Sequence, residues 1–258
     1  MPDSSSPDPS RDPSRVTTGH LSAPSIAGPW IVICDFDGTI SDVDVTDALL
    51  ERFALPEWEA IESEWKASLI SARECMARQV KLLRVTRPEL EAFLDTIDID
   101  AGFRQFIQEC RSRRLPVRVV SDGLDCVIRS ILRRHNLSQL SVTANQLITT
   151  GRNTYELQFP NSRVDCTAAS GTCKCANAEQ ESRDRRVLLI GDGRSDFCLA
   201  HNADFVFSKN KLSEYCESMG IPHRDFSGFS DMPFLLSELL DHPHHHVHRQ
   251  PLSWSLDR

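Results

Sequence analysis

Two aspartates directly follow an apolar segment, and their spacing suits a metal site. Residues Trp30–Cys34 are mostly apolar, and Asp35 and Asp37 come next, followed by Gly-Thr. Residues i and i+2 of an extended chain point the same way. Both carboxylates would therefore meet at the carboxyl end of a strand, where open α/β sheets bind ligands. Their mutual repulsion and desolvation are costly, and a divalent cation would offset that cost. The alternative is a strand that enters an ordinary Asp-Gly turn.

Two later apolar segments also end in polar groups, namely Ser121 and the pair Asp192 and Asp196. If the three segments are parallel strands, their ends lie at one edge of a sheet. Lys174 lies in an irregular stretch shortly before the last of them. These residues supply what phosphoryl transfer through a carboxylate requires: a nucleophile, a proton donor, cations for the phosphoryl oxygens and oxygen ligands for Mg²⁺.

Four motifs occur in order along the chain: Asp35-Phe36-Asp37-Gly38-Thr39-Ile40, Ser121, Lys174 and Gly191-Asp192-Gly193-Arg194-Ser195-Asp196. This ordered set resembles the haloacid dehalogenase (HAD) superfamily, over about residues 30–240. The dehalogenases of the superfamily lack the second acid of the first motif. The presence of Asp37 therefore favours phosphoryl chemistry.

The resemblance implies a role for each motif. Asp35 is the nucleophile that becomes an aspartyl phosphate, and Asp37 is the general acid and then the base that activates water. Asp35, the backbone carbonyl of Asp37 and Asp192 would hold Mg²⁺, with Asp196 supporting the site. The residues expected to bind phosphate are Ser121, Asp122, Gly123 and Lys174.

The chain also resembles particular subgroups of the superfamily. A helical insert between the first two motifs is similar to the small cap of the subgroup that contains phosphoserine phosphatase. Residues 53–58 and 171–175 resemble the methionine-salvage enolphosphatase-like group, which acts on 2-hydroxy-3-keto-5-methylthiopentenyl-1-phosphate. That group usually has Ser-Gly-Gly in place of Ser121-Asp122-Gly123, and it has more cysteines before the lysine. The exact substrate therefore stays open.

Alternating strand and helix patterns predict an α/β fold, a doubly wound, Rossmann-like parallel sheet. Four amphipathic segments between residues 44 and 100 interrupt the alternation and predict the helical cap. The expected core strands are 30–34, 116–120, 186–190 and 204–207, with a hairpin within 141–159. The expected core helices are 101–113, 124–135, a polar helix ending near 185, a short helix after 196, 211–219 and 230–241.

The predicted domains follow from these patterns. Residues 29–43 and 101–241 form the core, and residues 44–100 form the cap. Residues 1–28 are rich in Ser, Pro, Asp and Arg and are predicted to be disordered. Residues 242–258 form a His-rich tail, which could capture Ni²⁺ or Zn²⁺ adventitiously or simply be solvated.

Composition narrows the class of protein. The chain has 258 residues and a formal net charge of -8, which argues against a nucleic-acid partner. No run reaches the roughly 18 apolar residues of a membrane span, and the N-terminus shows no secretory signal. Nine cysteines, such as Cys34 and Cys126, lie mostly in apolar segments. This pattern favours buried, reduced thiols in a cytoplasmic protein.

Four residues could contact the substrate. Asp44 could do so from the edge of the cap, or it could only cap the first cap helix. The arginine that binds the substrate carboxylate in phosphoserine phosphatases aligns with Gln79, beside Arg78. Arg194 could face the site or be a solvated loop residue. Trp58 and Trp65 are predicted to belong to the core of the cap.

Three cysteines near the lysine, Cys166, Cys173 and Cys175, could bind a metal. Their spacing lacks a Cys-x-x-Cys pair, so thiols packed around the lysine loop are the favoured interpretation.

We therefore predict an Mg²⁺-dependent phosphatase acting on a small phosphorylated metabolite. The rival within the same chemistry is a phosphoserine phosphatase. A phosphomutase would pass the phosphoryl group to a sugar hydroxyl. A non-catalytic regulatory or phosphate-binding protein would be expected to lose Asp35, Asp37 or Lys174, which this chain retains.

Overall fold

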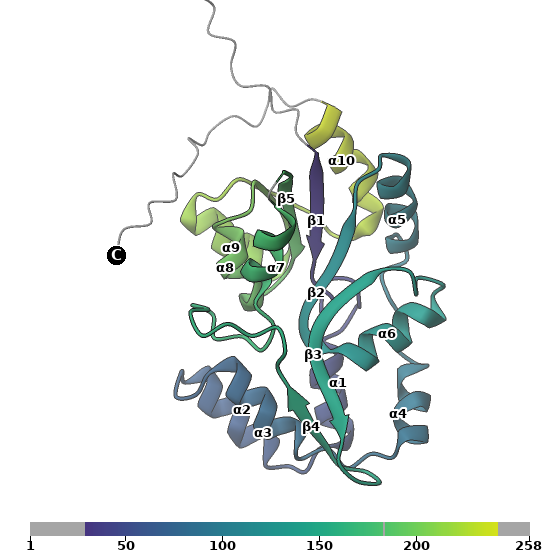
Figure 1. Cartoon of the computed structure of the whole chain (residues 1–258), viewed down its shortest axis with the longest axis vertical. Helices are drawn as coiled ribbons and strands as arrows, with labels where there is room; N and C mark the ends of the chain where they lie inside the picture. Colours follow the sequence, from purple (N-terminus) through teal and green to yellow (C-terminus); the bar gives the residue numbers. More distant parts are fainter. Residues whose placement is uncertain (1–28, 183, 242–258) are drawn as a thin grey trace, which may run out of the picture.

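A seven-stranded sheet forms the centre of the computed structural model, which describes residues 29–182 and 184–241 (Figure 1). The strand order is β4-β3-β2-β1-β5-β6-β7, and every pairing is parallel except that of β3 with β4. The strands are β1 (Trp30–Cys34), β2 (Val117–Leu124), β3 (Ser141–Thr149), β4 (Tyr155–Gln158), β5 (Arg186–Gly191), β6 (Phe205–Ser208) and β7 (His223–Asp225). The predicted doubly wound α/β sheet is confirmed.

The central strand β1 is buried on both faces, as its apolar sequence requires. Ile31 and Ile33 belong to the hydrophobic cluster on one face, and Val32 and Cys34 to the cluster on the other. All four side chains are 0% exposed. Their period of two is that of an extended chain between two helical layers.

Two helical layers cover the sheet (Figure 1). One layer contains α5 (Phe103–Ser112), α6 (Asp125–Arg134) and α10 (Met232–Asp241). The other contains α7 (Lys174–Glu181), α8 (Phe197–Ala200) and α9 (Asn210–Met219). The 3₁₀ turns η1 (Arg194–Asp196) and η2 (Phe229–Asp231) precede α8 and α10.

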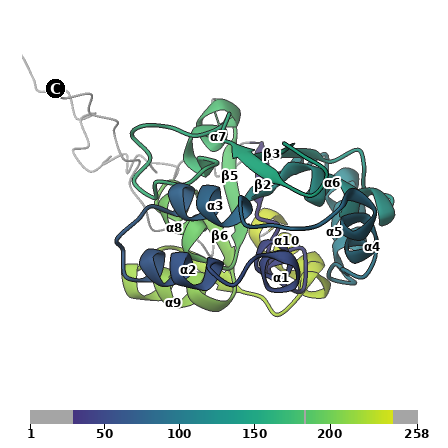
Figure 2. The same ribbon diagram turned by 90° about the horizontal axis from the view of Figure 1, so that it is seen from below.

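The insert after β1 holds four helices, as the sequence predicts: α1 (Val45–Phe53), α2 (Trp58–Lys66), α3 (Ala72–Val80) and α4 (Arg87–Leu94). Local signals fix their starts. Ser71 accepts a hydrogen bond from the Glu74 amide at the start of α3, and Thr86 and Glu89 form a capping box at the start of α4. Viewed toward the carboxyl ends of the strands, α2 and α3 lie in front of the sheet (Figure 2).

Four local predictions need correction. The edge strand β7 was not expected, because three residues give too short a pattern. Strand β2 continues through Ser121, Asp122 and Gly123 to Leu124. Lys174 is the first residue of α7, not part of the irregular stretch.

The fourth correction concerns Cys126, which is exposed although the segment around it is largely apolar, with Leu124 and Val127 nearby. It lies on the outer face of α6, whose opposite face is buried. The predictions for residues 1–28 and 242–258 lie outside the described residues. Within the described part of the chain, no helix has the length and hydrophobicity of a membrane span.

Candidate active site at the carboxyl edge of the sheet

The ends of three neighbouring strands converge on one cleft. Asp35 follows β1, Ser121 lies near the end of β2, and Asp192 follows β5. Because β1 lies between β2 and β5, the three groups meet at its carboxyl end. They line a cleft of about 1360 Å³, whose opposite wall comes from the α2–α3 region. The predicted meeting of the three motifs is therefore observed.

A buried lysine connects two of the motifs. The Lys174 Nζ atom lies 2.8 Å from Asp35 Oδ2 and 2.6 Å from Asp196 Oδ1. It also donates to Ser195 Oγ at 3.0 Å. Burial alone would lower the pKa of Lys174, but Asp196 and Asp35 together raise it above its usual value. The lysine is therefore held as a cation against Asp35.

Asp37 lies beside Asp35 and is oriented by the backbone. Its Oδ1 accepts a hydrogen bond from the Val45 amide at 2.9 Å, and its Oδ2 lies 3.4 Å from Ser121 Oγ. Gly123 packs directly against Asp37, because a Cβ at position 123 would overlap the Asp37 carboxylate. Burial, and then the charges of Asp44 and Asp35, raise the pKa of Asp37 well above its usual value.

A bulge places Ser121 in the site. The pairing of β2 with β3 is irregular between Val120 and Leu124. Bulges of this kind redirect side chains next to active sites. Ser121 Oγ, which is fully buried, also accepts a hydrogen bond from the Gly123 amide at 3.0 Å.

The motif that holds Asp192 approaches the first motif through a glycine in the left-handed region. Gly38 has φ +68°, and a Cβ there would lie 2.8 Å from Asp192 Oδ2. Only glycine combines this conformation with so close an approach. Thr39 Oγ1 donates to Asp192 Oδ1 at 2.9 Å. Burial and the charge of Asp35 raise the pKa of Asp192.

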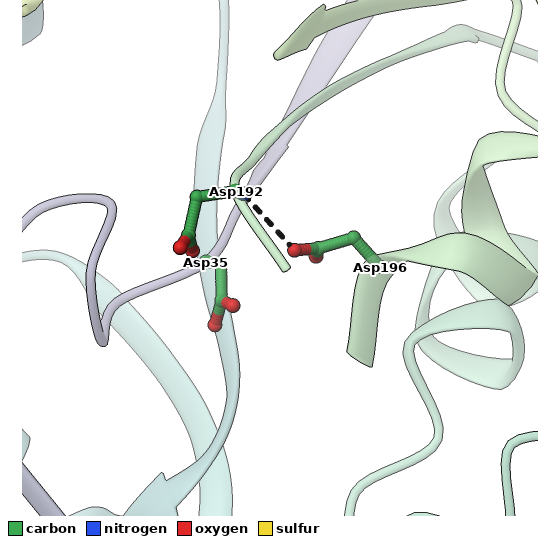
Figure 3. Close-up of side chains that lie close together, drawn as sticks. All are labelled: Asp35, Asp192 and Asp196. Atoms are coloured by element: carbon green, nitrogen blue, oxygen red, sulfur yellow. Dashed lines mark hydrogen bonds between the residues drawn. The ribbon is translucent and has the colours of Figure 1, made fainter. Parts of the chain in front are cut away.

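Three carboxylates form a possible metal site (Figure 3). Asp35, Asp192 and Asp196 each offer an oxygen atom, and these atoms all lie within 4.8 Å of one another. No described residue donates a hydrogen bond to the backbone carbonyl of Asp37, which leaves that oxygen available. Carboxylate and carbonyl oxygens are the ligands that Mg²⁺ prefers, so the donor set fits that ion.

Asp196 is more occupied than the other two carboxylates. Its Oδ1 faces Lys174. Its Oδ2 accepts from the Asp192 amide, as Figure 3 shows, and from the Gly193 amide, at 3.2 Å each. Burial raises the pKa of Asp196 to about 7, and Lys174 opposes that rise. These contacts suit the supporting role that the sequence predicts for Asp196.

The predicted substrate residues separate in the structure. Gln79 lines the cleft, is 3% exposed, and donates through Nε2 to Glu62 Oε2 at 3.0 Å. Arg78 does not line the cleft. It forms a double hydrogen bond with Glu64, at 2.6 and 3.0 Å. The two neighbours thus have different surroundings, which their sequence positions alone do not reveal.

Asp44 and Arg194 also lie at the cleft. Asp44 caps α1 by accepting from the Asp47 amide at 2.9 Å, and burial raises its pKa to about 7. The Arg194 guanidinium lies 5.6 Å from the centre of the Trp65 ring, within range of a cation–π interaction. Trp65 is therefore part of the cleft wall, not of the cap core as predicted, because α2 faces the loop after β5.

Sequence reasoning missed Asn145, a fully buried residue of β3. Its Nδ2 donates to Asp122 Oδ1 at 3.0 Å, and its Oδ1 accepts from Thr172 Oγ1 at 3.0 Å. The Thr172 amide also donates to Asp122 Oδ1, at 2.9 Å. This network, here called the Asn145 network, ties β2 and β3 to the loop before Lys174. An isolated Asn in a strand gives no sequence signal for such a role.

Comparisons with known proteins agree with this geometry. The profile of the haloacid dehalogenase-like hydrolases matches residues 32–201. A 2-hydroxy-3-keto-5-methylthiopentenyl-1-phosphate phosphatase from Exiguobacterium sp. is 35% identical over 205 residues, which cover 78% of this chain and 94% of that protein. The protein of the same name from Geobacillus kaustophilus is 31% identical over 206 residues, with 78% and 93% covered.

Solved structures resemble the fold. A HAD family hydrolase from Salmonella enterica superposes with a TM-score of 0.65 at 16% identity, covering 83% of this chain and 74% of that one. A phospho-aspartyl intermediate analogue of phosphoserine phosphatase superposes with a TM-score of 0.55 at 20% identity, covering 73% and 91%. The strand-end acids, the buried lysine and these matches lead to one assignment: the chain belongs to the haloacid dehalogenase-like hydrolase family.

Proposed function

We propose that the chain is an Mg²⁺-dependent phosphomonoesterase of a small phosphorylated metabolite, with 2-hydroxy-3-keto-5-methylthiopentenyl-1-phosphate as its substrate. The observation that carries the proposal is the Asp35 carboxylate, 2.8 Å from the Lys174 ammonium and beside Asp37. This arrangement combines a nucleophile, a cation for the phosphoryl oxygens and a second acid. The relatives named for this substrate support the choice of metabolite.

In the proposed reaction, a carboxylate oxygen of Asp35 attacks phosphorus and the bond from phosphorus to the ester oxygen breaks. Asp37 gives its proton to the leaving oxygen. Asp37 then takes a proton from water, and the resulting hydroxide attacks the aspartyl phosphate. The bond between Asp35 and phosphorus breaks, which releases inorganic phosphate and restores the Asp35 carboxylate, while Asp37 is protonated again.

The residues proposed to hold Mg²⁺ are Asp35, Asp192 and the carbonyl of Asp37, with Asp196 supporting them. A bound divalent cation supplies positive charge where the phosphoryl oxygens develop negative charge. Ser121, Asp122, Gly123 and Lys174 are proposed to surround the phosphate. The Asp122 carboxylate is already engaged with the Thr172 amide and Asn145, so its contribution would be to shape this part of the site.

Phosphoserine phosphatase is the alternative, because its fold is similar. A phosphoserine enzyme must bind a carboxylate, and Arg does this best through paired donors. Gln79 offers only neutral donors here, and its amide already faces the Glu62 carboxylate. The carboxylate of a phosphoserine substrate at that place would lie beside the Glu62 carboxylate, which carries the same charge. The surroundings of Gln79 therefore favour a substrate without a carboxylate.

Purified protein should be assayed against the enol-phosphate and L-phosphoserine in direct competition, at equal and sub-saturating concentrations with Mg²⁺. We expect the enol-phosphate to be consumed first. Preferential consumption of L-phosphoserine would favour the alternative. No phosphate release from either compound, or from a broader panel of phosphorylated metabolites, would reject the phosphatase proposal.

We also propose a cytoplasmic location. All nine cysteines are free, although the Sγ atoms of Cys175 and Cys198 are 2.8 Å apart. Reduced thiols are typical of that compartment.

A further inference from the structure

Two cysteines face each other at the wall of the cleft, one of them in its lining and the other behind it. Cys175 is the second residue of α7, and Cys198 is the second residue of α8. Their Sγ atoms are 2.8 Å apart. Cys198 lines the cleft together with Thr167, whose Oγ1 lies 3.2 Å from Cys198 Sγ. Both thiols are partly exposed, so a small oxidant can enter through the cleft.

We infer that Cys175 and Cys198 form a reversible disulfide when peroxide is present, and that this disulfide slows the reaction in the active site. The oxidant is a peroxide, with hydrogen peroxide as the simplest member of the class. The Cys198 thiolate attacks one peroxide oxygen, the O–O bond breaks, and hydroxide leaves as the sulfenic acid forms. The Cys175 thiolate then attacks that sulfur and displaces hydroxide. Two thiols and one peroxide molecule give one disulfide and two water molecules.

The geometry favours a disulfide over a structural zinc ion. Tetrahedral zinc with bonds of about 2.3 Å keeps two thiolates roughly 3.7 Å apart, farther than the two sulfurs are here. Among residues 29–182 and 184–241, the acids of the active site form the one set of three or more His, Cys, Asp or Glu ligand atoms within 4.8 Å of one another. Cys166 and Cys173 therefore do not complete a compact metal site with this pair.

The pair is coupled to the active site by its neighbours in the chain. Lys174 directly precedes Cys175, and Asp196 stands two residues before Cys198. Lys174 and Asp196 contact each other at 2.6 Å, and Lys174 also contacts Asp35. In a disulfide the sulfurs are about 2.05 Å apart instead of 2.8 Å, and the first turn of α7 is joined covalently to α8. Lys174 and Asp196 lie in or beside these joined segments, and catalytic groups tolerate displacements of only about 0.5 Å, so we infer that oxidation slows turnover.

The effect on turnover rests on the proposed phosphatase function, whereas the disulfide itself does not. The experiment therefore uses two readouts on the full chain treated with hydrogen peroxide. Peptide mapping without reductant should join the segments of Cys175 and Cys198, with a loss of about 2 Da. Phosphatase kcat should fall about fivefold or more and recover with dithiothreitol.

Three variants provide the comparison. Cys175→Ser and Cys198→Ser should each keep their kcat in peroxide, whereas Cys126→Ser, which removes an exposed thiol on α6, should behave as wild type. Absence of the cross-linked peptide would overturn the disulfide, and so would one tightly bound zinc per purified chain that Cys175→Ser no longer holds. A cross-link without a change in kcat, or an equal loss of kcat in Cys198→Ser, would overturn its effect on the site. Absence of any phosphatase activity would reject the proposed function and leave the peptide map as the test of the disulfide.

Discussion

The two oxygens of Asp35 have different surroundings. Oδ1 accepts from the Phe36 amide at 2.8 Å, which fixes the carboxylate plane. Oδ2 faces Lys174 and lies 3.3 Å from Ser195 Oγ. A carboxylate held in one orientation by backbone and cation needs little reorganisation before it reacts.

Replacing Asp35 by Asn keeps the shape of the side chain and removes its charge. We expect phosphatase kcat to fall by at least about a thousandfold, as for other lost nucleophiles. Far-UV circular dichroism and the melting temperature should confirm that the fold persists. Asp42→Asn, an exposed change seven residues along the chain, is the matched control and should stay near wild type. Near wild-type turnover of Asp35→Asn would reject the nucleophile assignment.

Glu62 would pair with a cation placed at position 79 and so keep it from the substrate. In Gln79→Arg, the new guanidinium would meet Glu62, which now accepts from Gln79 at 3.0 Å. We expect this variant to gain little activity on L-phosphoserine. The double variant Glu62→Gln with Gln79→Arg frees the guanidinium for the substrate. It should gain about one to two decades in kcat/KM, from a charged hydrogen bond of roughly 1.5–3 kcal/mol.

The double-mutant cycle with L-phosphoserine tests this coupling. Glu62→Gln alone is the control for the loss of the acid. Equal gains from Gln79→Arg and the double variant would mean that Glu62 does not restrain position 79.

At the scale of elements, the Asn145 network joins two strands and a loop from separate parts of the sequence. It connects the end of β2, the middle of β3 and the loop that leads into α7. The Asn145 side chain also lies 3.9 Å from Met76 Sδ on α3. One buried amide therefore touches both the core and the helical insert.

Asn145→Ala should reduce the free energy of unfolding by about 2–3 kcal/mol, because Thr172 Oγ1 and Asp122 lose buried partners. It should also lower kcat, since the loop before Lys174 loses an anchor. Urea unfolding measures the first effect, and a phosphatase assay the second. Gln146→Ala removes the next, exposed side chain of β3 and should change neither quantity much. Equal behaviour of the two variants would contradict the network.

At the scale of the whole molecule, the acids of the site come from two distant parts of the chain. Asp35 and Asp192 offer a bound ion only a few protein oxygen atoms as ligands. Mg²⁺ keeps several waters and tolerates few protein ligands, whereas Ca²⁺ takes six to eight oxygens. EDTA should therefore abolish phosphatase activity, Mg²⁺ should restore it, and Ca²⁺ should not. Full activity after dialysis against EDTA would contradict this prediction.

The assigned site residues all lie between Asp35 and Asp196, so we expect the proposed reaction to need neither terminal segment. Deleting residues 1–26 and 243–258 should leave kcat/KM within about threefold of wild type. Steady-state kinetics and the melting temperature of the shortened protein test this. A loss of about a hundredfold with an unchanged melting temperature would assign a terminal segment to the site.

The sequence by itself determined the doubly wound sheet and the edge of the sheet that carries the candidate site. Buried strands such as β1 are continuous apolar runs, and that pattern is visible without tertiary contacts. The meeting of Asp35, Ser121 and Asp192 could be predicted because parallel strands bring their carboxyl ends to one edge, whereas Lys174 begins α7 and does not follow a strand. The four helices of the insert were also predictable from periodicity and caps.

Only the tertiary structure decided the partners of individual side chains. Arg78 and Gln79 are neighbours in sequence, but successive residues of a helix point about 100° apart, so one pairs with Glu64 and the other faces the cleft. The closeness of Cys175 and Cys198 depends on how α7 packs beside α8. Such contacts depend on how whole helices pack against one another, which local patterns do not encode.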